Sequence, residues 1–212
     1  MLAGGGWFKK VTGGRPVRAV VSPLTRCLNT ATNVLKGLPI NATNVEELCR
    51  ETLGEDTCDA RRSVSDPPAG GGGAADAPAG KKSPQPPCKF DKGLRSKFPG
   101  FKFKVYDPLD EQGRGFGLLG DEDQLWTKGS REIQQHQVKR AKRFLDILWA
   151  NTPEKVVVIV THSGFARSLL LAVEREPYRP ANAELVPVIV DRNIGRDDVT
   201  SHDDDVIAAS RR

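Results

Sequence analysis

The sequence predicts an α/β domain with a mostly parallel sheet, and three observations lead to this fold class. The chain has 212 residues, which is long enough for one domain with a sizeable hydrophobic core. Two short runs rich in β-branched residues, at 17–22 and 156–161, are typical of strands. Each run is followed by apolar residues at helical spacing. Because parallel strands need a crossover between them, this strand–helix order favours a parallel sheet.

The first strand–helix unit occupies the N-terminal part of the chain. Strand 17–22 ends at a proline, and Gly37 closes the helix that follows. The apolar positions of this helix are Leu24, Leu28, Ala31 and Leu35. Residues 1–16 are expected to form the end of a helix and a loop, with Trp7 and Phe8 as packing residues.

The second unit begins with the clearest helix, which is predicted over 130–150. Its apolar stripe consists of Ile133, Ala141, Phe144, Leu145 and Leu148, whereas Lys139, Arg140, Lys142 and Arg143 are expected to face solvent. Strand 156–161 is apolar along most of its length, as is typical of a strand buried on both faces. A turn at 162–164 leads into a helix that carries Ala166, Leu169, Leu170 and Val173. Residues 184–190 are predicted to form a further strand, and Pro187 within it favours an edge position.

The composition divides the chain into one domain, an insertion and a tail. Five glycines and six prolines fall between residues 66 and 87, where no aromatic residue, Val, Leu or Ile occurs. Such a segment cannot offset the entropy cost of ordering. We therefore expect a single domain over 1–190, a disordered insertion at about 66–88 and a flexible polar tail at 191–212.

Several classes of protein are excluded by the same composition. The longest wholly apolar run is five residues, whereas a membrane helix needs roughly 20. The N-terminus has no apolar stretch typical of a secretory signal, so a cytoplasmic protein is expected. The four cysteines include no Cys-x-x-Cys pair, which argues against a disulfide scaffold or a zinc site. A net charge of +5 is compatible with anionic ligands but does not by itself indicate nucleic acid.

Two polar turns follow the two principal strands and mark the candidate site. One carries Ser22 and Arg26, and the other carries His162 and Ser163. Ligands of a parallel sheet bind at the carboxyl ends of its strands, where the N–H groups of helix N-termini favour an anion such as phosphate. A guanidinium and an imidazole add further donors. The alternative is that Arg26 is a solvated helix residue and His162 a structural cap.

Residues 22–26 read Ser-Pro-Leu-Thr-Arg, and residues 157–164 read Val-Val-Ile-Val-Thr-His-Ser-Gly. These segments resemble the phosphate pocket and the second catalytic histidine of the histidine phosphatase superfamily, the phosphoglycerate-mutase-like proteins. Residues 47–54 are similar to the segment that supplies this family's proton donor. Further segments that resemble the plant and fungal branch are 57–63, 98–103, 125–126, 131–132 and 182–184. The resemblance extends from about residue 17 to residue 190.

The resemblance implies a three-layer α/β/α sandwich and phosphomonoester hydrolysis through a phosphohistidine, without a metal or other cofactor. In such a site fixed cations stabilise the charge on the phosphoryl oxygens. By the resemblance, Arg26 clamps the phosphate, Glu51 protonates the leaving alcohol and His162 is the second histidine. Further candidates for contact with the phosphate or with a distal anionic group are Ser163, Arg61 and Arg62.

The sequence departs from the family at the nucleophile, which there lies in an Arg-His-Gly triplet on a central strand. None of the three histidines, His136, His162 and His202, belongs to such a triplet. The family's second histidine donates to the phosphate from the opposite side, so His162 is not expected to replace the nucleophile. We therefore expect an N-terminally truncated domain that binds phosphate and hydrolyses it poorly or not at all. The alternative is a phosphate-binding pseudoenzyme that acts as a scaffold.

A second alternative concerns residues 81–104, which hold eight Lys or Arg residues and four phenylalanines. Basic residues interleaved with aromatic residues can bind single-stranded nucleic acid. The other interpretation, which we favour, is that the phenylalanines of 98–103 anchor the chain on the core after the insertion. The expected partner is therefore a phosphorylated small molecule or phosphoprotein, rather than a membrane or nucleic acid.

Overall fold

The computed structural model describes residues 6–54, 56–66, 92–107 and 114–191. The predicted insertion at 66–88 lies outside the described residues apart from Asp66, and the predicted tail lies outside them apart from Asp191. The side chain of Trp7 is not described either. None of the helices in the described ranges has the length and hydropathy needed to cross a membrane.

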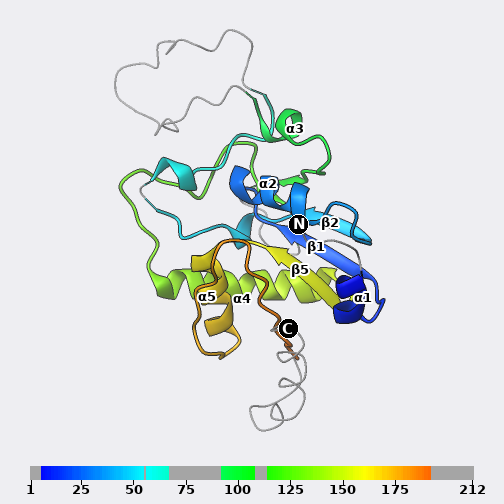
Figure 1. The fold of residues 1–212 in the computed structure, drawn as a ribbon. Coiled ribbons are helices and arrows are strands. Elements are labelled where there is room, and N and C mark those ends of the chain that lie inside the picture. The colour runs from blue at the N-terminus through cyan, green and yellow to red at the C-terminus, as the bar shows by residue number, and fades with distance from the viewer. Residues whose placement is uncertain (1–5, 55, 67–91, 108–113, 192–212) are drawn as a thin grey trace, which may run out of the picture.

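A three-stranded parallel sheet lies at the centre of the molecule (Figure 1). Its strands are β1 (Val17–Val21), β2 (Ala42–Val45) and β5 (Val156–Val160), in the order β2-β1-β5. Both neighbours of β1 run parallel to it, with Ala19 opposite Thr43 on one side and Val158 on the other. The predicted α/β class with a parallel sheet is confirmed.

Helices cover both faces of this sheet. Successive strand residues point to opposite faces, so Val21 packs with α2 (Thr25–Val34), whereas Val20 packs with α4 (Gln134–Asn151) and α5 (Ser163–Ala172). On the α4 side, the rings of Phe144 and Phe165 meet edge to face at 5.7 Å between centroids. The result is a helix–sheet–helix sandwich.

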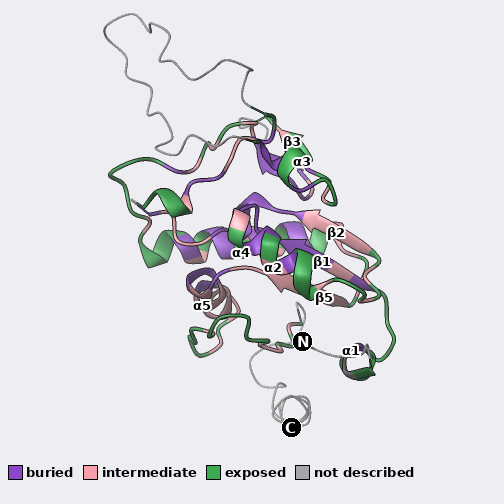
Figure 2. Cartoon of the chain, turned by 45° about the horizontal axis from the view of Figure 1, so that its top comes forward, coloured by how far each residue is buried: buried purple, intermediate pink, exposed green. Residues whose placement is uncertain are grey.

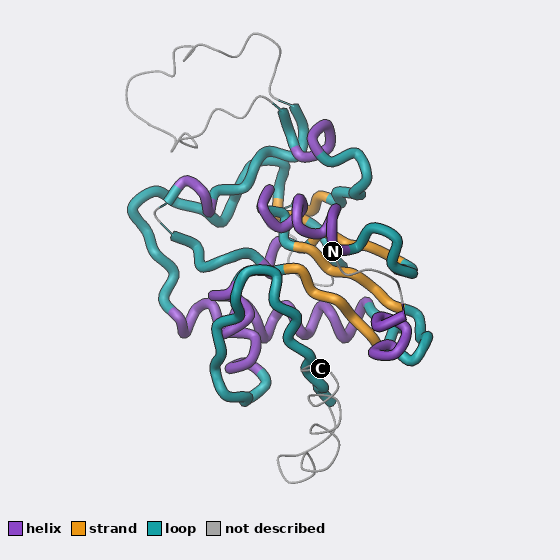
Figure 3. The backbone as a smooth tube through the Cα atoms, viewed as in Figure 1, coloured by secondary structure: helices purple, strands orange, loops and turns teal. Residues whose placement is uncertain are grey.

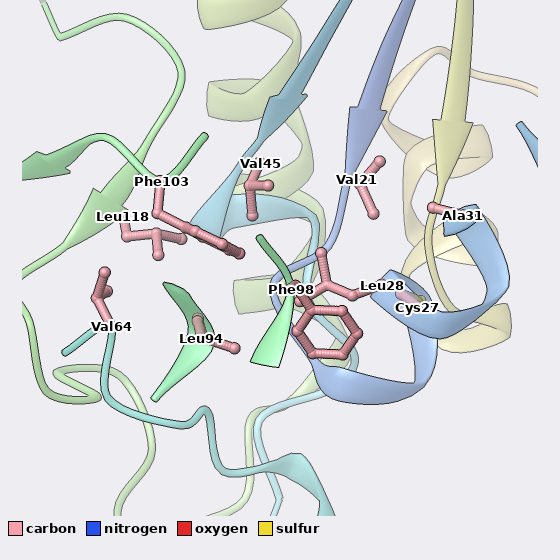
Figure 4. Close-up of a cluster of buried hydrophobic side chains, with 10 residues drawn as sticks. All are labelled: Val21, Cys27, Leu28, Ala31, Val45, Val64, Leu94, Phe98, Phe103 and Leu118. Atoms are coloured by element: carbon pink, nitrogen blue, oxygen red, sulfur yellow. The ribbon is translucent and has the colours of Figure 1, made fainter. Parts of the chain in front are cut away.

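The core on the α2 side includes the segment that follows the predicted insertion (Figure 4). Its buried members are Val21, Cys27, Leu28, Ala31, Val45, Val64, Leu94, Phe98, Phe103 and Leu118. Phe98 and Phe103 are both less than one tenth exposed, and Phe101 packs against the same cluster. These three rings anchor the returning chain on the core, as we favoured.

Short elements connect the main ones. Phe8 on α1 (Gly6–Thr12) is buried, as expected of a packing residue. The remaining elements are the 3₁₀ turns η1 (Glu47–Cys49) and η2 (Thr57–Asp59), the helix α3 (Leu94–Lys97), and the strands β3 (Val105–Tyr106) and β4 (Leu118–Leu119). The two short strands pair with each other in parallel.

Two expectations about strands are wrong. The predicted strand 156–161 is not buried on both faces, because every residue of β5 keeps intermediate exposure at the edge of the described sheet (Figure 2). The predicted strand 184–190 does not form, and the described residues after α5 run as loop (Figure 3). Pro187 lacks an N–H group, and residues 184–190 pair with none of the described strands.

Two expectations about α4 are also wrong. The helix starts at Gln134, and Ile133 precedes it as a 53% exposed N-cap residue instead of joining the apolar stripe. Arg140 does not face solvent but is buried. The reason is that its guanidinium binds a carboxylate and several backbone carbonyls beside the candidate site, which compensates for its burial.

Candidate functional site

The candidate site lies where β1 and β5 end and α2 and α5 begin. Ser22 follows β1 and donates its backbone N–H to the Val160 carbonyl of β5 at 3.0 Å. His162 follows β5 and is the N-cap residue of α5. Because β1 and β5 are neighbours in parallel, Ser22 Oγ lies 2.8 Å from His162 Nε2, although 140 residues separate them.

His162 is a neutral, fully engaged imidazole. Arg26 donates from Nε to His162 Nδ1 at 3.1 Å, which leaves the ring proton on Nε2, where it is donated to Ser22 Oγ. Burial lowers the pKa of His162 to about 3, with a further contribution from nearby arginines, of which Arg26 is the most important. The ring is therefore uncharged near neutral pH.

Arg26 stands in the first turn of α2 and has its guanidinium at the surface of the site, with 43% of its side chain exposed. It donates to the Cys58 carbonyl at 2.6 Å and to the Asp59 carboxylate at 3.0 Å. The carboxylate of Asp59 thus occupies the position in which an anionic ligand would meet this guanidinium.

Glu51 places its carboxylate against the N-terminus of α5. It accepts from the backbone N–H of Thr52 at 2.8 Å and faces the N–H of Gly164 at 3.4 Å. A Cβ atom at position 164 would collide with Glu51 Oε1, so only glycine allows this approach. The proton donor implied by the resemblance and His162 therefore lie on the same helix terminus.

Two buried side chains of α4 hold the backbone around Glu51. Arg140 donates to the carbonyls of Leu48, Arg50 and Glu51 and pairs with Glu132 at 2.6 Å. Gln137 donates to Thr52 Oγ1 at 3.1 Å and accepts from Ser168 Oγ of α5 at 2.8 Å. Sequence reasoning missed both residues. The signal was their spacing, because positions 137 and 140 share a helical face with the buried Ala141 and Phe144.

A network of buried ion pairs lies behind this segment. Arg50 is fully buried and binds Glu47 at 2.8 Å and Asp123 at 2.7 Å. Arg61, only 2% exposed, also pairs with Glu47 and donates to a series of backbone carbonyls. The Arg50 guanidinium helps to lower the pKa of Asp123 to about 2, against the opposing effect of burial.

Three further residues were predicted to contact the phosphate or a distal anionic group, namely Arg61, Arg62 and Ser163. Arg61 is enclosed by its network and cannot reach a ligand's distal group. Arg62 lies beside the first turn of α2, with Nε 3.3 Å from Thr25 Oγ1. Ser163 is the first residue of α5, next to Gly164.

Cys27 adds a thiol to the inner wall of the site. Its Sγ lies 3.3 Å from His162 Nε2 and 3.2 Å from the Thr161 carbonyl. Burial raises the pKa of Cys27 to about 12, so the group stays a neutral thiol and is not an activated nucleophile.

An open pocket of about 210 Å³ lies next to these residues. It is lined by Glu51, Thr52, Gly54, Asp56, Asp59, Arg131, Gly164 and Arg179. In the described part of the chain, no three His, Cys, Asp or Glu side chains are grouped so as to hold a metal ion. The arrangement offers guanidinium groups, helix N–H groups and a carboxylic acid, which suits an anionic, polar ligand.

Comparison with known proteins identifies relatives from plants and fungi. The chain is 29% identical to phosphoglycerate mutase-like protein 1 of Arabidopsis thaliana, over 82% of this chain and 61% of that protein. It is 24% identical to a probable phosphoglycerate mutase of Arthroderma benhamiae, over 87% of this chain and 45% of that protein. It is 25% identical to phosphomutase-like protein 3 of Candida albicans, over 83% of this chain and 44% of that protein.

These matches cover most of this chain but only part of each relative. The chain spans between 44% and 61% of the length of these three curated relatives. No protein-family model and no solved structure matches it significantly.

Proposed function

We propose that this chain, which belongs to the phosphoglycerate mutase-like superfamily of histidine phosphatases, binds a phosphomonoester at the ends of β1 and β5. The observation that carries the proposal is the contact between Arg26 and His162, which brings two segments 136 residues apart to one pair of helix N-termini. Glu51 faces the same place.

In the proposed complex, phosphate oxygens take over donors that internal groups occupy in the structure. The Arg26 guanidinium exchanges the Asp59 carboxylate for a phosphate oxygen, which preserves a charge-assisted hydrogen bond. His162 carries its proton on Nε2 and donates it to the ligand when it leaves Ser22. The N-terminus of α5, where Ser163 lies, adds its dipole.

Glu51 is the proposed general acid for the leaving alcohol. Its carboxyl group is fixed by Thr52 and by the close approach to Gly164, and it lines the pocket that would hold the rest of the substrate. Position is the first requirement of a general acid, because it must lie within hydrogen-bond distance of the leaving oxygen.

Hydrolysis through a phosphohistidine requires a nucleophile that the 212 residues do not provide in an Arg-His-Gly triplet. Both ring nitrogens of His162 are engaged, one by Ser22 and the other by Arg26, so neither is free to attack a phosphorus atom. We therefore propose a phosphatase-type site that, in this chain alone, binds without turnover. The second candidate is a protein that binds phosphate as a scaffold and has no catalytic role at all. It is favoured by the internal pairing of the candidate phosphate donors, since His162 is bonded to Ser22 and Arg26 to Asp59.

The test is calorimetric titration of the chain with inorganic phosphate. Arg26→Gln is expected to weaken binding about tenfold, because it removes a charge-assisted hydrogen bond. Lys36→Gln, an exposed residue just beyond the other end of α2, serves as the matched control and leaves binding unchanged. Equal binding by both variants would refute the proposed site.

A parallel assay with p-nitrophenyl phosphate is expected to show no hydrolysis by the wild-type chain, and turnover there would refute binding without catalysis.

A further inference from the structure

The inner wall of the candidate site holds a thiol that the proposed binding of phosphate does not use. Cys27 follows Arg26 on α2 and is buried. Its Sγ lies 3.3 Å from Nε2 of His162 and 3.2 Å from the Thr161 carbonyl, and it also interacts with the Ser22 hydroxyl. These polar groups meet away from solvent, since Ser22 and His162 are buried as well.

Each polar hydrogen in this cluster needs an acceptor within it, because a buried donor without a partner is costly. Arg26 donates from Nε to His162 Nδ1 at 3.1 Å, and a guanidinium cannot accept a hydrogen bond. Nδ1 is then the acceptor, and Nε2 carries the ring proton, which it donates to Ser22 Oγ at 2.8 Å. The hydroxyl proton of Ser22 consequently cannot go to His162.

Cys27 supplies the acceptor that the Ser22 hydroxyl lacks. Its sulfur can accept the hydroxyl proton, while its own S–H donates to the Thr161 carbonyl. The hydrogen bonds thus run in one direction, from the Arg26 guanidinium to the Thr161 carbonyl. Burial raises the pKa of Cys27 to about 12, so the S–H stays protonated and available for this donation.

Without the sulfur, a different arrangement of protons becomes favourable. The Ser22 hydroxyl would donate to His162 Nε2, and the ring proton would move to Nδ1. Nδ1–H would then face the Nε–H of Arg26, so that two donors would meet at 3.1 Å and the contact would break. Both the tautomer of His162 and the contact that places Arg26 therefore depend on the side chain at position 27.

We propose that Cys27 is a positioning residue, whose thiol fixes His162 in the Nε2-protonated tautomer and thereby holds Arg26 and the Nε2–H group in place for a phosphate oxygen. The role of the ligand rests on the proposed function, whereas the tautomer is a property of the folded chain alone. The sequence gave no sign of this role, because it depends on a contact between residues 135 positions apart.

The first measurement is the tautomer of His162 in the wild-type chain. Long-range ¹H–¹⁵N correlation spectra of the chain labelled with ¹⁵N-histidine show which ring nitrogen carries the proton. The signals of His162 are those absent from the spectrum of His162→Gln. The proton is expected on Nε2, and a proton on Nδ1 would refute the proposal without any further variant.

Cys27→Ala is expected to move the ring proton to Nδ1. It should also weaken the binding of inorganic phosphate about fivefold in calorimetric titration, which is the usual value of one hydrogen bond. Cys27→Ser keeps both a donor and an acceptor, so it is expected to restore the wild-type tautomer and an affinity within about twofold of the wild type.

Cys49→Ala is the matched control. This cysteine is also buried, but its S–H donates to the Glu46 carbonyl and not to a group of the site. Its loss is expected to lower stability in urea denaturation about as much as Cys27→Ala does, while the tautomer and the phosphate affinity stay unchanged. If Cys27→Ala does not fold, Cys27→Val takes its place, since valine fills the space without a donor or an acceptor.

The proposal is overturned if the variant without the thiol keeps the proton on Nε2, or if Cys27→Ser does not restore it. It is also overturned if Cys49→Ala moves the proton, because any loosening of the core would then have this effect. If the wild-type chain does not bind phosphate, or binds it independently of Arg26, the proposed function fails. The spectra still decide in that case whether Cys27 holds His162.

Discussion

The arginines around the candidate site fall into two groups, which differ in burial and in the partners that they bind. Arg50, Arg61 and Arg140 are buried and bind carboxylates and backbone carbonyls. Arg26 and Arg131 in front are exposed. Removing one partner of a buried ion pair is strongly destabilising, because it leaves a buried charge uncompensated. An exposed guanidinium can exchange one partner for another at little cost in free energy. The buried group therefore stabilises the backbone that carries Glu51, and the exposed group is the one that we propose recognises a ligand.

The largest expected effect comes from breaking the buried group. Arg50→Met leaves the carboxylates of Glu47 and Asp123 without their shared partner and is expected to lower the free energy of unfolding by about 3–5 kcal/mol. Urea denaturation followed by circular dichroism measures the change. Arg15→Met, at an exposed position before β1, is the control and is expected to change stability by less than about 0.5 kcal/mol. A loss below about 1 kcal/mol for Arg50→Met would contradict the assigned role.

A second effect comes from protonating the buried imidazole. The pKa of His162 is lowered from 6.5 to about 3 in the folded chain, so between these values the unfolded state binds the additional proton. Stability should therefore fall as the pH drops from about 6.5 towards 3, by several kcal/mol at most. The lowered pKa of Asp123, about 2, extends the loss below pH 3.8.

The variant His162→Gln tests this origin. Its stability is expected to vary less between pH 6.5 and 4 than that of the wild-type chain, in denaturant titrations at several pH values. His136→Gln removes an exposed histidine of α4 and should leave the pH profile unchanged. If both variants keep the wild-type profile, His162 does not cause the acid sensitivity.

The smallest expected effect concerns the ion pair between Arg26 and Asp59. Asp59→Asn frees the Arg26 guanidinium from its internal anion and is expected to raise the affinity for inorganic phosphate about two- to fivefold. Asp56→Asn removes the same charge from the same segment without a contact to Arg26, and should have a smaller effect. Weaker phosphate binding by Asp59→Asn would show instead that Asp59 orients the guanidinium for its ligand.

Two strands that are similar in sequence, β1 and β5, differ in how far they are buried in the folded chain. β1 and β5 are both five-residue, valine-rich strands followed by a polar turn and a helix. β1 lies between two partners and is mostly fully buried, whereas β5 has only β1 beside it in the described sheet. A hydrophobic run reports that a strand forms, but the number of its neighbours decides how far it is buried.

The sequence by itself determined the two strand–helix units, the parallel sheet, the family resemblance and the placement of Arg26 and His162 at strand ends. These features depend on residue types close together in the chain, because periodicity and turn residues act over a few positions. Only the tertiary structure decided that Arg140 is buried, that Arg61 is enclosed, that residues 184–190 form no strand, and that Asp59 pairs with Arg26. Each of these outcomes depends on a partner distant in sequence, since a charged side chain is buried, or a strand paired, only where the fold supplies its counterpart.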